Sequence, residues 1–304
     1  MDFACSVGVV ALLVVASLAY GVRVLFHGAA MFERVERDQG SALLGRSLMQ
    51  MGYWALDHVG RGLVALGATA NGVSIASLLF GIAAGVALAF GHFGLGAALA
   101  VVSGLGDTLD GIVARRTKTA SDAGEVLDAA VDRYEEFFFL GGIVVHERGS
   151  AVGVSLVLSA LLGSFMVSYA TAKAEALRAE VPRGAMRRPE RAAYLIAGAA
   201  LTPLLAPLLG GATVAASWTA ELPILAAVGL VAVIANVSAV RRLAKLAAAV
   251  GGPRGAPAVA RSTSPRKPDA TPVDVEADVE AVVEAPASRA PLRDAEPLGR
   301  IDAT

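Results

Sequence analysis

The chain has 304 residues, of which 55% are hydrophobic and 17% are charged, and its formal net charge is −1 at pH 7. This composition excludes an ordinary water-soluble domain and indicates an integral membrane protein, and the near-zero charge gives no sign of a nucleic-acid partner. Cys5 is the only cysteine, which excludes a disulfide within the chain.

Seven apolar segments are long enough to cross a bilayer, which takes about 20 residues in a helix. They cover residues 4–26, 72–91, 94–115, 126–146, 151–175, 190–210 and 221–243. Each segment is continuously apolar rather than alternating, which favours helices over the strands of a membrane barrel. We therefore predict an all-α, polytopic membrane helix bundle with six core transmembrane helices, one additional N-terminal transmembrane helix and an interfacial amphipathic helix.

The N-terminal region, residues 1–40, contains the first of these helices and a linker. This helix could be mistaken for a signal peptide, but it has no basic start, and Arg23 follows it in place of a clear cleavage site. A retained helix is therefore expected. Residues 41–67 are moderately apolar and carry charged side chains such as Asp57 and Arg61, which is typical of an amphipathic helix lying in the membrane interface.

Residues 68–247 form the predicted membrane domain, and the charges of its loops indicate its orientation. Lys and Arg are concentrated around residues 115–118, 178–191 and 241–245, and the positive-inside rule places these connections in the cytoplasm. We therefore expect a multi-pass protein of the cytoplasmic (inner) membrane. Residues 248–304 contain eight of the 13 prolines and many charges, which predicts a disordered cytoplasmic tail.

The segment 107–132 reads DTLDGIVARRTKTASDAGEVLDAAVD and contains four aspartates at conspicuous spacings. Asp107 and Asp110 are three residues apart, so they share one face of a helix. Asp128 and Asp132 are four residues apart and share a face of the next helix. Carboxylates at membrane depth are costly and usually have a function. Two such faces turned towards each other would provide the oxygen ligands that Mg²⁺ prefers.

The full spacing over these 26 positions is Asp-x2-Asp-Gly-x2-Ala-Arg-x8-Gly-x3-Asp-x3-Asp. It resembles, position for position, the motif of the CDP-alcohol phosphotransferase (CDP-alcohol phosphatidyltransferase) family, membrane enzymes of phospholipid synthesis. The resemblance implies transfer of a phosphatidyl-type group from a CDP-linked lipid, such as CDP-diacylglycerol, to a small alcohol acceptor, with release of CMP. It also implies a homodimer and bound Mg²⁺ or Mn²⁺.

The resemblance further implies a role for each aspartate. Asp107, Asp110 and Asp128 would be metal ligands, and Asp132 would be both a ligand and the general base that deprotonates the acceptor hydroxyl. Two other classes of function remain as alternatives. A secondary transporter with buried carboxylates would show repeated halves, and the sequence has no internal repeat. A catalytically silent membrane scaffold would be expected to have lost an aspartate, and none is lost.

The residues around the aspartates predict a site for the CDP group. Gly111, Ala114 and Gly124 lack bulk, so a nucleotide can approach the backbone closely. Arg115 offers a guanidinium group to a phosphate oxygen, and Asp110 borders the same site.

An upstream segment, TANGVS at residues 69–74, resembles the family's Thr-Pro-Asn-x-x-Thr. It adds Asn71 and Ser74 as candidate nucleotide contacts. Helix capping is the alternative explanation for both residues.

Two downstream segments point to the acceptor: SYATAKAE at residues 168–175 and RRPER at residues 187–191. Both resemble segments of the prokaryotic phosphatidylinositol-phosphate synthase-like branch of the family, in which cations hold the phosphate of the acceptor. Lys173, Arg188 and Arg191 are therefore predicted to bind a phosphorylated acceptor, inositol phosphate or glycerol phosphate. Positive-inside anchoring is the alternative explanation for the same cations.

Overall fold

The computed structural model describes residues 1–28, 45–179, 184–209 and 220–251, with the side chains of residues 45–48 left out. The predicted disordered tail lies outside the described residues, except that the last helix continues to Val250.

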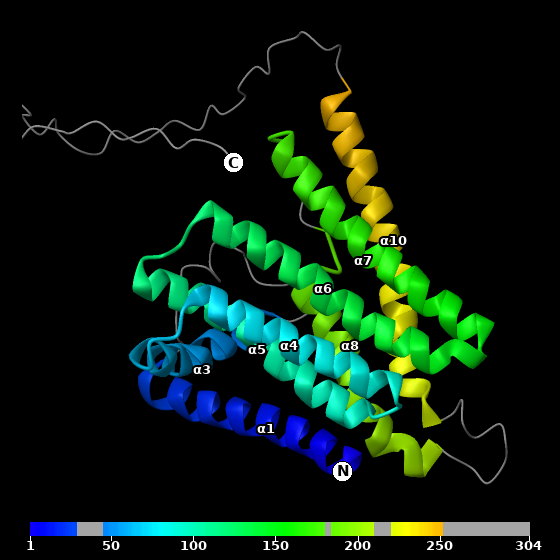
Figure 1. The fold of residues 1–304 in the computed structure, drawn as a ribbon, viewed down its shortest axis with the longest axis horizontal. Coiled ribbons are helices and arrows are strands. Elements are labelled where there is room, and N and C mark those ends of the chain that lie inside the picture. Colours follow the sequence, from blue (N-terminus) through cyan, green and yellow to red (C-terminus); the bar gives the residue numbers. More distant parts are fainter. Residues whose placement is uncertain (29–44, 180–183, 210–219, 252–304) are drawn as a thin grey trace, which may run out of the picture. The chain divides into compact units, whose positions relative to one another are not determined.

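Seven long helices in the described part of the chain correspond one to one to the seven predicted segments (Figure 1). They are α1 (Asp2–His27), α4 (Ala70–Ala89), α5 (Phe93–Thr117), α6 (Asp122–His146), α7 (Ala151–Ala176), α8 (Arg188–Leu209) and α10 (Leu222–Val250). A further helix, α3 (Gly45–Ala65), lies within the segment predicted to be amphipathic. The described residues contain no β-strand, so the all-α prediction is confirmed there.

Six of these helices are long and apolar enough to cross a membrane, counted over the described residues: α1, α4, α5, α7, α8 and α10. Helix α6 has 25 residues but carries acidic side chains in several turns, among them Asp128 and Asp132. A helix of this length with carboxylates along it is typical of one that lines a polar site within a bundle rather than facing lipid. The chain is thus a multi-pass membrane protein.

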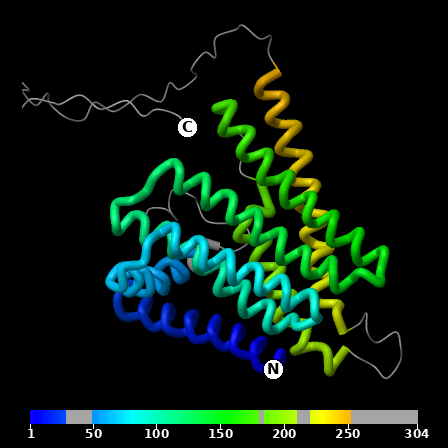
Figure 2. Tube along the Cα trace, viewed as in Figure 1, coloured from blue at the N-terminus to red at the C-terminus, as the bar shows by residue number. Residues whose placement is uncertain are grey.

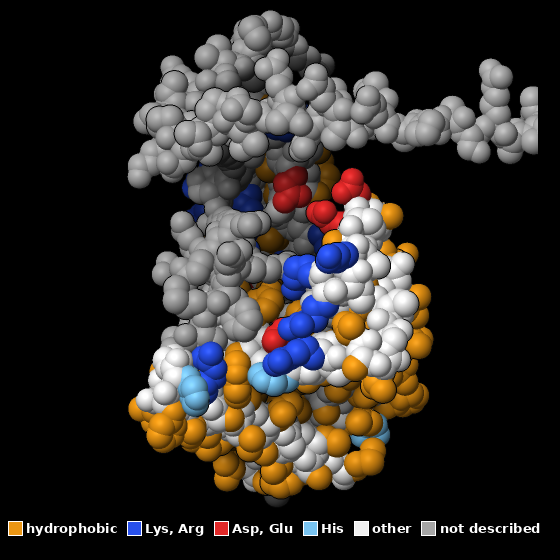
Figure 3. Space-filling view, turned by 90° about the vertical axis from the view of Figure 1, so that its left-hand side faces the viewer, with side chains coloured by type: hydrophobic (Ala, Val, Ile, Leu, Met, Phe, Trp, Pro, Cys, Tyr) orange, Lys and Arg blue, Asp and Glu red, His pale blue; other side chains and the backbone are white. Residues whose placement is uncertain are grey.

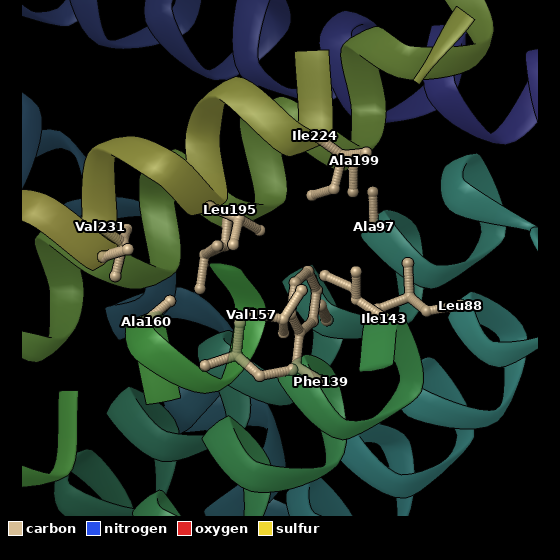
Figure 4. Packing of buried hydrophobic residues seen from close by; sticks show 14 of the residues in the cluster. Leu88, Ala97, Phe139, Ile143, Val157, Ala160, Leu195, Ala199, Ile224 and Val231 are labelled. Atoms are coloured by element: carbon tan, nitrogen blue, oxygen red, sulfur yellow. The ribbon is translucent and has the colours of Figure 1, made fainter. Parts of the chain in front are cut away.

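The hydrophobic core lies where side chains from α4, α5, α6, α7, α8 and α10 converge (Figure 4). Helix α4 packs extensively against both α5 and α6, whereas α5 and α6 have few contacts with each other. Helices α7 and α10 run alongside each other and form a second extensive contact (Figure 2). Helices α5 and α6, which carry the aspartates, are thus held in place mainly by their common packing on α4.

Helices α4 and α6 approach each other at two glycines. A Cβ atom added to Gly85 would lie 2.3 Å from the carbonyl oxygen of Phe138, and one added to Gly142 would lie 2.1 Å from the carbonyl oxygen of Gly85. Small residues allow this close approach, which is a common way to pack helices in lipid. The contact fixes α6 against α4 and so helps to set the position of the aspartates on α6.

Replacement of Gly142 with Ala should therefore destabilise the protein by about 1–3 kcal/mol, the usual range for overpacking. The obstructing atom belongs to the backbone of α4, which cannot rotate away as a side chain can. Gly141→Ala is the matched control, because nothing lies within 4 Å of a Cβ at Gly141. Thermal unfolding of the detergent-solubilised variants measures the difference. Equal melting temperatures would contradict the close contact.

Candidate metal centre and substrate site

A short connection reverses the chain between α5 and α6 (Figure 1). Lys118 ends α5 in a left-handed conformation with φ 57°, and the Ser121 hydroxyl caps α6 by accepting a hydrogen bond from the Gly124 N–H at 3.2 Å. The aspartates near the end of α5 therefore face those near the beginning of α6. Because both helices pack on α4, their acidic faces meet.

Three of the four predicted aspartates come together at this position. Asp107, Asp110 and Asp128 each offer a carboxylate oxygen, and these oxygens all lie within 4.8 Å of one another. Asp110 is buried, and Ser74 donates a hydrogen bond from its Oγ to Asp110 Oδ2. Three clustered carboxylate oxygens form a donor set that suits a hard divalent cation.

The fourth aspartate, Asp132, lies beside Arg188. Its Oδ1 is 2.8 Å from Arg188 Nη2, but the geometry is not that of a hydrogen bond, so this buried oxygen has no hydrogen-bond donor in the described structure. The same guanidinium donates hydrogen bonds to Asp107 Oδ2 and to Glu135 Oε2, the latter at 2.7 Å. Arg188, predicted from the sequence to bind the acceptor, therefore partly balances the negative charge of the aspartates here.

Glu135 and Glu136 follow Asp132 by one helical turn, and the sequence leaves their roles open. In the structure both form ion pairs with α8: Glu135 with Arg188, and Glu136 with Arg191. Glu135 Oε1 is a buried oxygen without a hydrogen-bond partner among the described residues. Glu135 and Glu136 follow Asp132 by three and four residues, which places them on the same side of the helix as Asp132. This spacing could have identified both glutamates as neighbours of the site.

Arg191, which the sequence predicts to contact the acceptor phosphate, is buried in the structure and paired with an acidic residue of α6. Its side chain is 1% exposed and forms a two-bond ion pair with Glu136, at 2.7 Å and 2.9 Å. Arg191 Nη1 also donates to the carbonyl oxygen of Met186 at 2.7 Å. The guanidinium of Arg191 therefore links α8 to α6. A buried charge needs such partners, because they offset the hydration that it has lost.

The residues predicted to contact CDP lie close to the aspartates or at the same end of α5 and α6. Ser74 is buried against Asp110, and Asn71 is exposed in the first turn of α4. Neither is the N-cap of α4, because Thr69 has that role and accepts a hydrogen bond from the Gly72 N–H at 3.1 Å.

The remaining candidates flank the connection between α5 and α6. Gly111, Ala114 and Gly124 are partly buried, whereas the Arg115 side chain is exposed.

Cations gather on the face of the molecule at which α5 ends and α6 begins. Figure 3 shows Lys and Arg side chains in a band across this face, beside a predominantly hydrophobic area. Lys173 is exposed near the end of α7, and Arg242 of α10 donates a hydrogen bond to Thr171 Oγ1 at 3.0 Å. The Arg242 Nε is buried without a hydrogen-bond partner among the described residues.

Arg242 also lines a cavity of about 210 Å³ together with Arg241 and Lys245. From the sequence, these three cations were expected only to mark the cytoplasmic end of the last helix, although their clustering on one turn of α10 is visible there.

Comparisons with known proteins identify the region that carries this site. The family model described as CDP-alcohol phosphatidyltransferase matches residues 68–232. An archaetidylinositol phosphate synthase of Methanothermobacter thermautotrophicus is 36% identical over 138 residues, which are 45% of this chain and 69% of the relative. A phosphatidylinositol phosphate synthase of Mycobacterium marinum is 31% identical over 187 residues, which are 60% of this chain and 75% of the relative.

Solved structures of Mycobacterium tuberculosis phosphatidylinositol phosphate synthase are also similar to this chain. One, with CDP-DAG bound, has a TM-score of 0.54 at 25% identity and covers 64% of this chain and 95% of that chain. Another, in complex with manganese and citrate, has a TM-score of 0.55 at 26% identity and covers 64% of this chain and 90% of that chain.

Proposed function

The chain belongs to the CDP-alcohol phosphatidyltransferase family, and from this premise we propose that it transfers a phosphatidyl group from CDP-diacylglycerol, or a similar CDP-linked lipid, to a phosphorylated alcohol. The observation that carries the proposal is the cluster of Asp107, Asp110 and Asp128 oxygens within 4.8 Å of one another at the junction of α5 and α6. A pyrophosphate substrate requires such a cluster to bind metal near its negative charge.

Mg²⁺ or Mn²⁺ fits the residues that are present. Asp107, Asp110 and Asp128 would hold it, and Asp132 adds a buried oxygen that lacks a hydrogen-bond donor. A bound divalent cation stabilises the negative charge that develops on the leaving phosphate. The M. tuberculosis relative crystallised with manganese supports this choice of metal.

The residues of the chain perform the other parts of the reaction. Asp132 accepts the proton of the acceptor hydroxyl, and the acceptor oxygen then forms a bond to the phosphorus that carries the diacylglycerol. The bond from that phosphorus to the CMP oxygen breaks, and CMP leaves. Ser74 holds Asp110 in position through its hydrogen bond, and Arg188 lies beside Asp132, where its positive charge can also attract a phosphate.

Inositol phosphate is the acceptor that we propose, ahead of glycerol phosphate. The relatives named as inositol phosphate lipid synthases support this choice. Arg188 lies beside the aspartates and Lys173 is exposed near the end of α7, so both can supply positive charge to a phosphorylated acceptor. A Lys or Arg cluster attracts a phosphorylated acceptor more strongly than a neutral one.

We further propose that this end of the bundle faces the cytoplasm and that the protein is a homodimer in the cytoplasmic membrane. The Lys- and Arg-rich face in Figure 3 supports the orientation, because positive loops are usually retained in the cytoplasm. CDP-linked lipids and phosphorylated alcohols would be available on this side.

Release of CMP by purified protein tests the proposed function. CDP-diacylglycerol should be converted with inositol phosphate faster than with glycerol phosphate, free inositol or serine. EDTA should abolish the reaction, and Mg²⁺ or Mn²⁺ should restore it, because the clustered carboxylates need a cation to hold the pyrophosphate. Full activity after removal of metal would contradict the metal centre. A preference for free inositol or serine would contradict the phosphorylated acceptor.

A further inference from the structure

Helix α1 lies outside the residues matched by the family model, yet it is docked on α5 at its beginning and on α3 near its end. At its beginning, Asp2 Oδ1 accepts a hydrogen bond from the Leu95 N–H at 2.9 Å, which caps the first turn of α5. A Cβ at Gly94 would lie 2.2 Å from the carbonyl oxygen of Asp2, so the two helices touch there. Near its end, the Tyr20 ring packs against that of Trp54 in α3, with 5.9 Å between their centroids.

Between these two anchors, α1 borders a cavity of about 590 Å³ that also touches α4, α5, α6 and α8. The wall contributed by α1 consists of Val9, Val10 and Leu13. Small side chains on the facing helices, such as Gly104 of α5 and Ala193 of α8, leave the space open. The volume lies within the range of about 300–1,000 Å³ that is usual for small-molecule sites.

The cavity changes in character along its length. One end is bordered by Asp107, Glu135 and Arg188, which belong to the candidate active site. The lining contributed by α1 and by most of α8 is aliphatic. The aliphatic part of such a lining suits hydrocarbon better than water, so a molecule that matches the whole cavity has a charged group at one end and a long apolar body.

We propose that α1 forms the outer wall of an acyl-chain site, in which one hydrocarbon chain of the lipid donor lies between α1, α5 and α8. The inference rests on the proposed function. If the CDP group binds at the aspartates, the acyl chains attached to it must leave the site close to Asp107 and Arg188. The cavity begins at these residues. Without α1, the aliphatic faces of α5 and α8 would be open to the bilayer on this side. Helix α1 thereby makes donor binding dependent on acyl-chain length.

A bulky side chain at Val10 tests the proposal. Val10→Phe should raise the KM for a long-chain donor, dioleoyl CDP-diacylglycerol, by a factor about ten times larger than the factor by which it raises the KM for the short-chain dioctanoyl donor. Apolar pockets discriminate to about this extent between ligands that differ slightly in size. Val15→Phe is the matched control, since Val15 is 63% exposed and is not among the residues that line the cavity. It should leave both KM values unchanged. An equal effect of Val10→Phe on both donors, or none on either, would overturn the proposal.

A crosslinking experiment separates this inference from the proposed function, because it requires no turnover. The probe is CDP-diacylglycerol with a photoreactive diazirine near the end of one acyl chain. The full-length wild-type protein is irradiated with the probe and then digested. Mass spectrometry should find the label in the peptide that contains Val9, Val10 and Leu13, and Val10→Phe should reduce the amount of label in this peptide. Label confined to other helices would refute the role of α1 while leaving the CDP site in place. Absence of saturable labelling anywhere would instead refute the lipid donor itself, and with it this inference.

Discussion

Replacement of Asp132 with Asn should reduce kcat by about 100- to 10,000-fold, the usual contribution of a general base. The affinity for CDP-diacylglycerol should change much less, because proton removal from the acceptor and binding of the donor are separate steps. The three oxygens that cluster within 4.8 Å belong to the other aspartates and remain in place. Steady-state rates of CMP release and equilibrium binding of the donor measure the two effects.

Two further variants show whether the effect is specific to Asp132. Asp107→Asn should weaken donor binding as well as turnover, because Asp107 belongs to the three-oxygen cluster and also pairs with Arg188. Glu125→Gln should have little effect on either, because Glu125 is exposed in the first turn of α6. If Asp132→Asn retains kcat within about tenfold of the wild type, which is below the usual contribution of a base, another group removes the proton.

Replacement of Arg191 with Gln should destabilise the protein by about 3–5 kcal/mol, the usual cost of breaking a buried ion pair. The change leaves the Glu136 carboxylate, which is 9% exposed, without the guanidinium that holds both of its oxygens. A double variant, Glu136→Leu with Arg191→Met, should regain much of the loss, because it leaves no unpaired charge. Thermal unfolding in detergent provides the measurement.

An exposed ion pair offers the control for this prediction. Arg61→Gln removes a 3.6 Å pair with Asp57 in which the Arg61 side chain is 53% exposed. Such surface pairs contribute about 0–1 kcal/mol, so the melting temperature should hardly change. One outcome would instead support the role in acceptor binding that the sequence predicts for Arg191. If Arg191→Gln keeps the wild-type melting temperature and raises only the KM of the acceptor, Arg191 binds the acceptor phosphate.

Local features of the sequence were enough to predict the helices and the clustering of three aspartates that could hold a metal ion. The length of each apolar segment predicts a transmembrane helix, because the bilayer has a nearly constant thickness. Helical periodicity alone places Asp107 and Asp110 on one face of α5. The short connection at residues 118–121 makes α5 and α6 adjacent, so that Asp128 joins them without information from distant parts of the chain.

The partners of the charged residues were decided only by the tertiary structure. Arg188 contacts Asp107 across 81 positions of the sequence, and Arg191 contacts Glu136 across 55. These pairings depend on how α8, which packs on α5, is rotated and shifted relative to α5 and α6. A soluble helix reveals its buried face through an apolar stripe, but a helix in lipid is apolar on most sides, so its sequence contains little information about that rotation. The docking of α1 against α5 was equally hidden, because it depends on the close fit at Gly94.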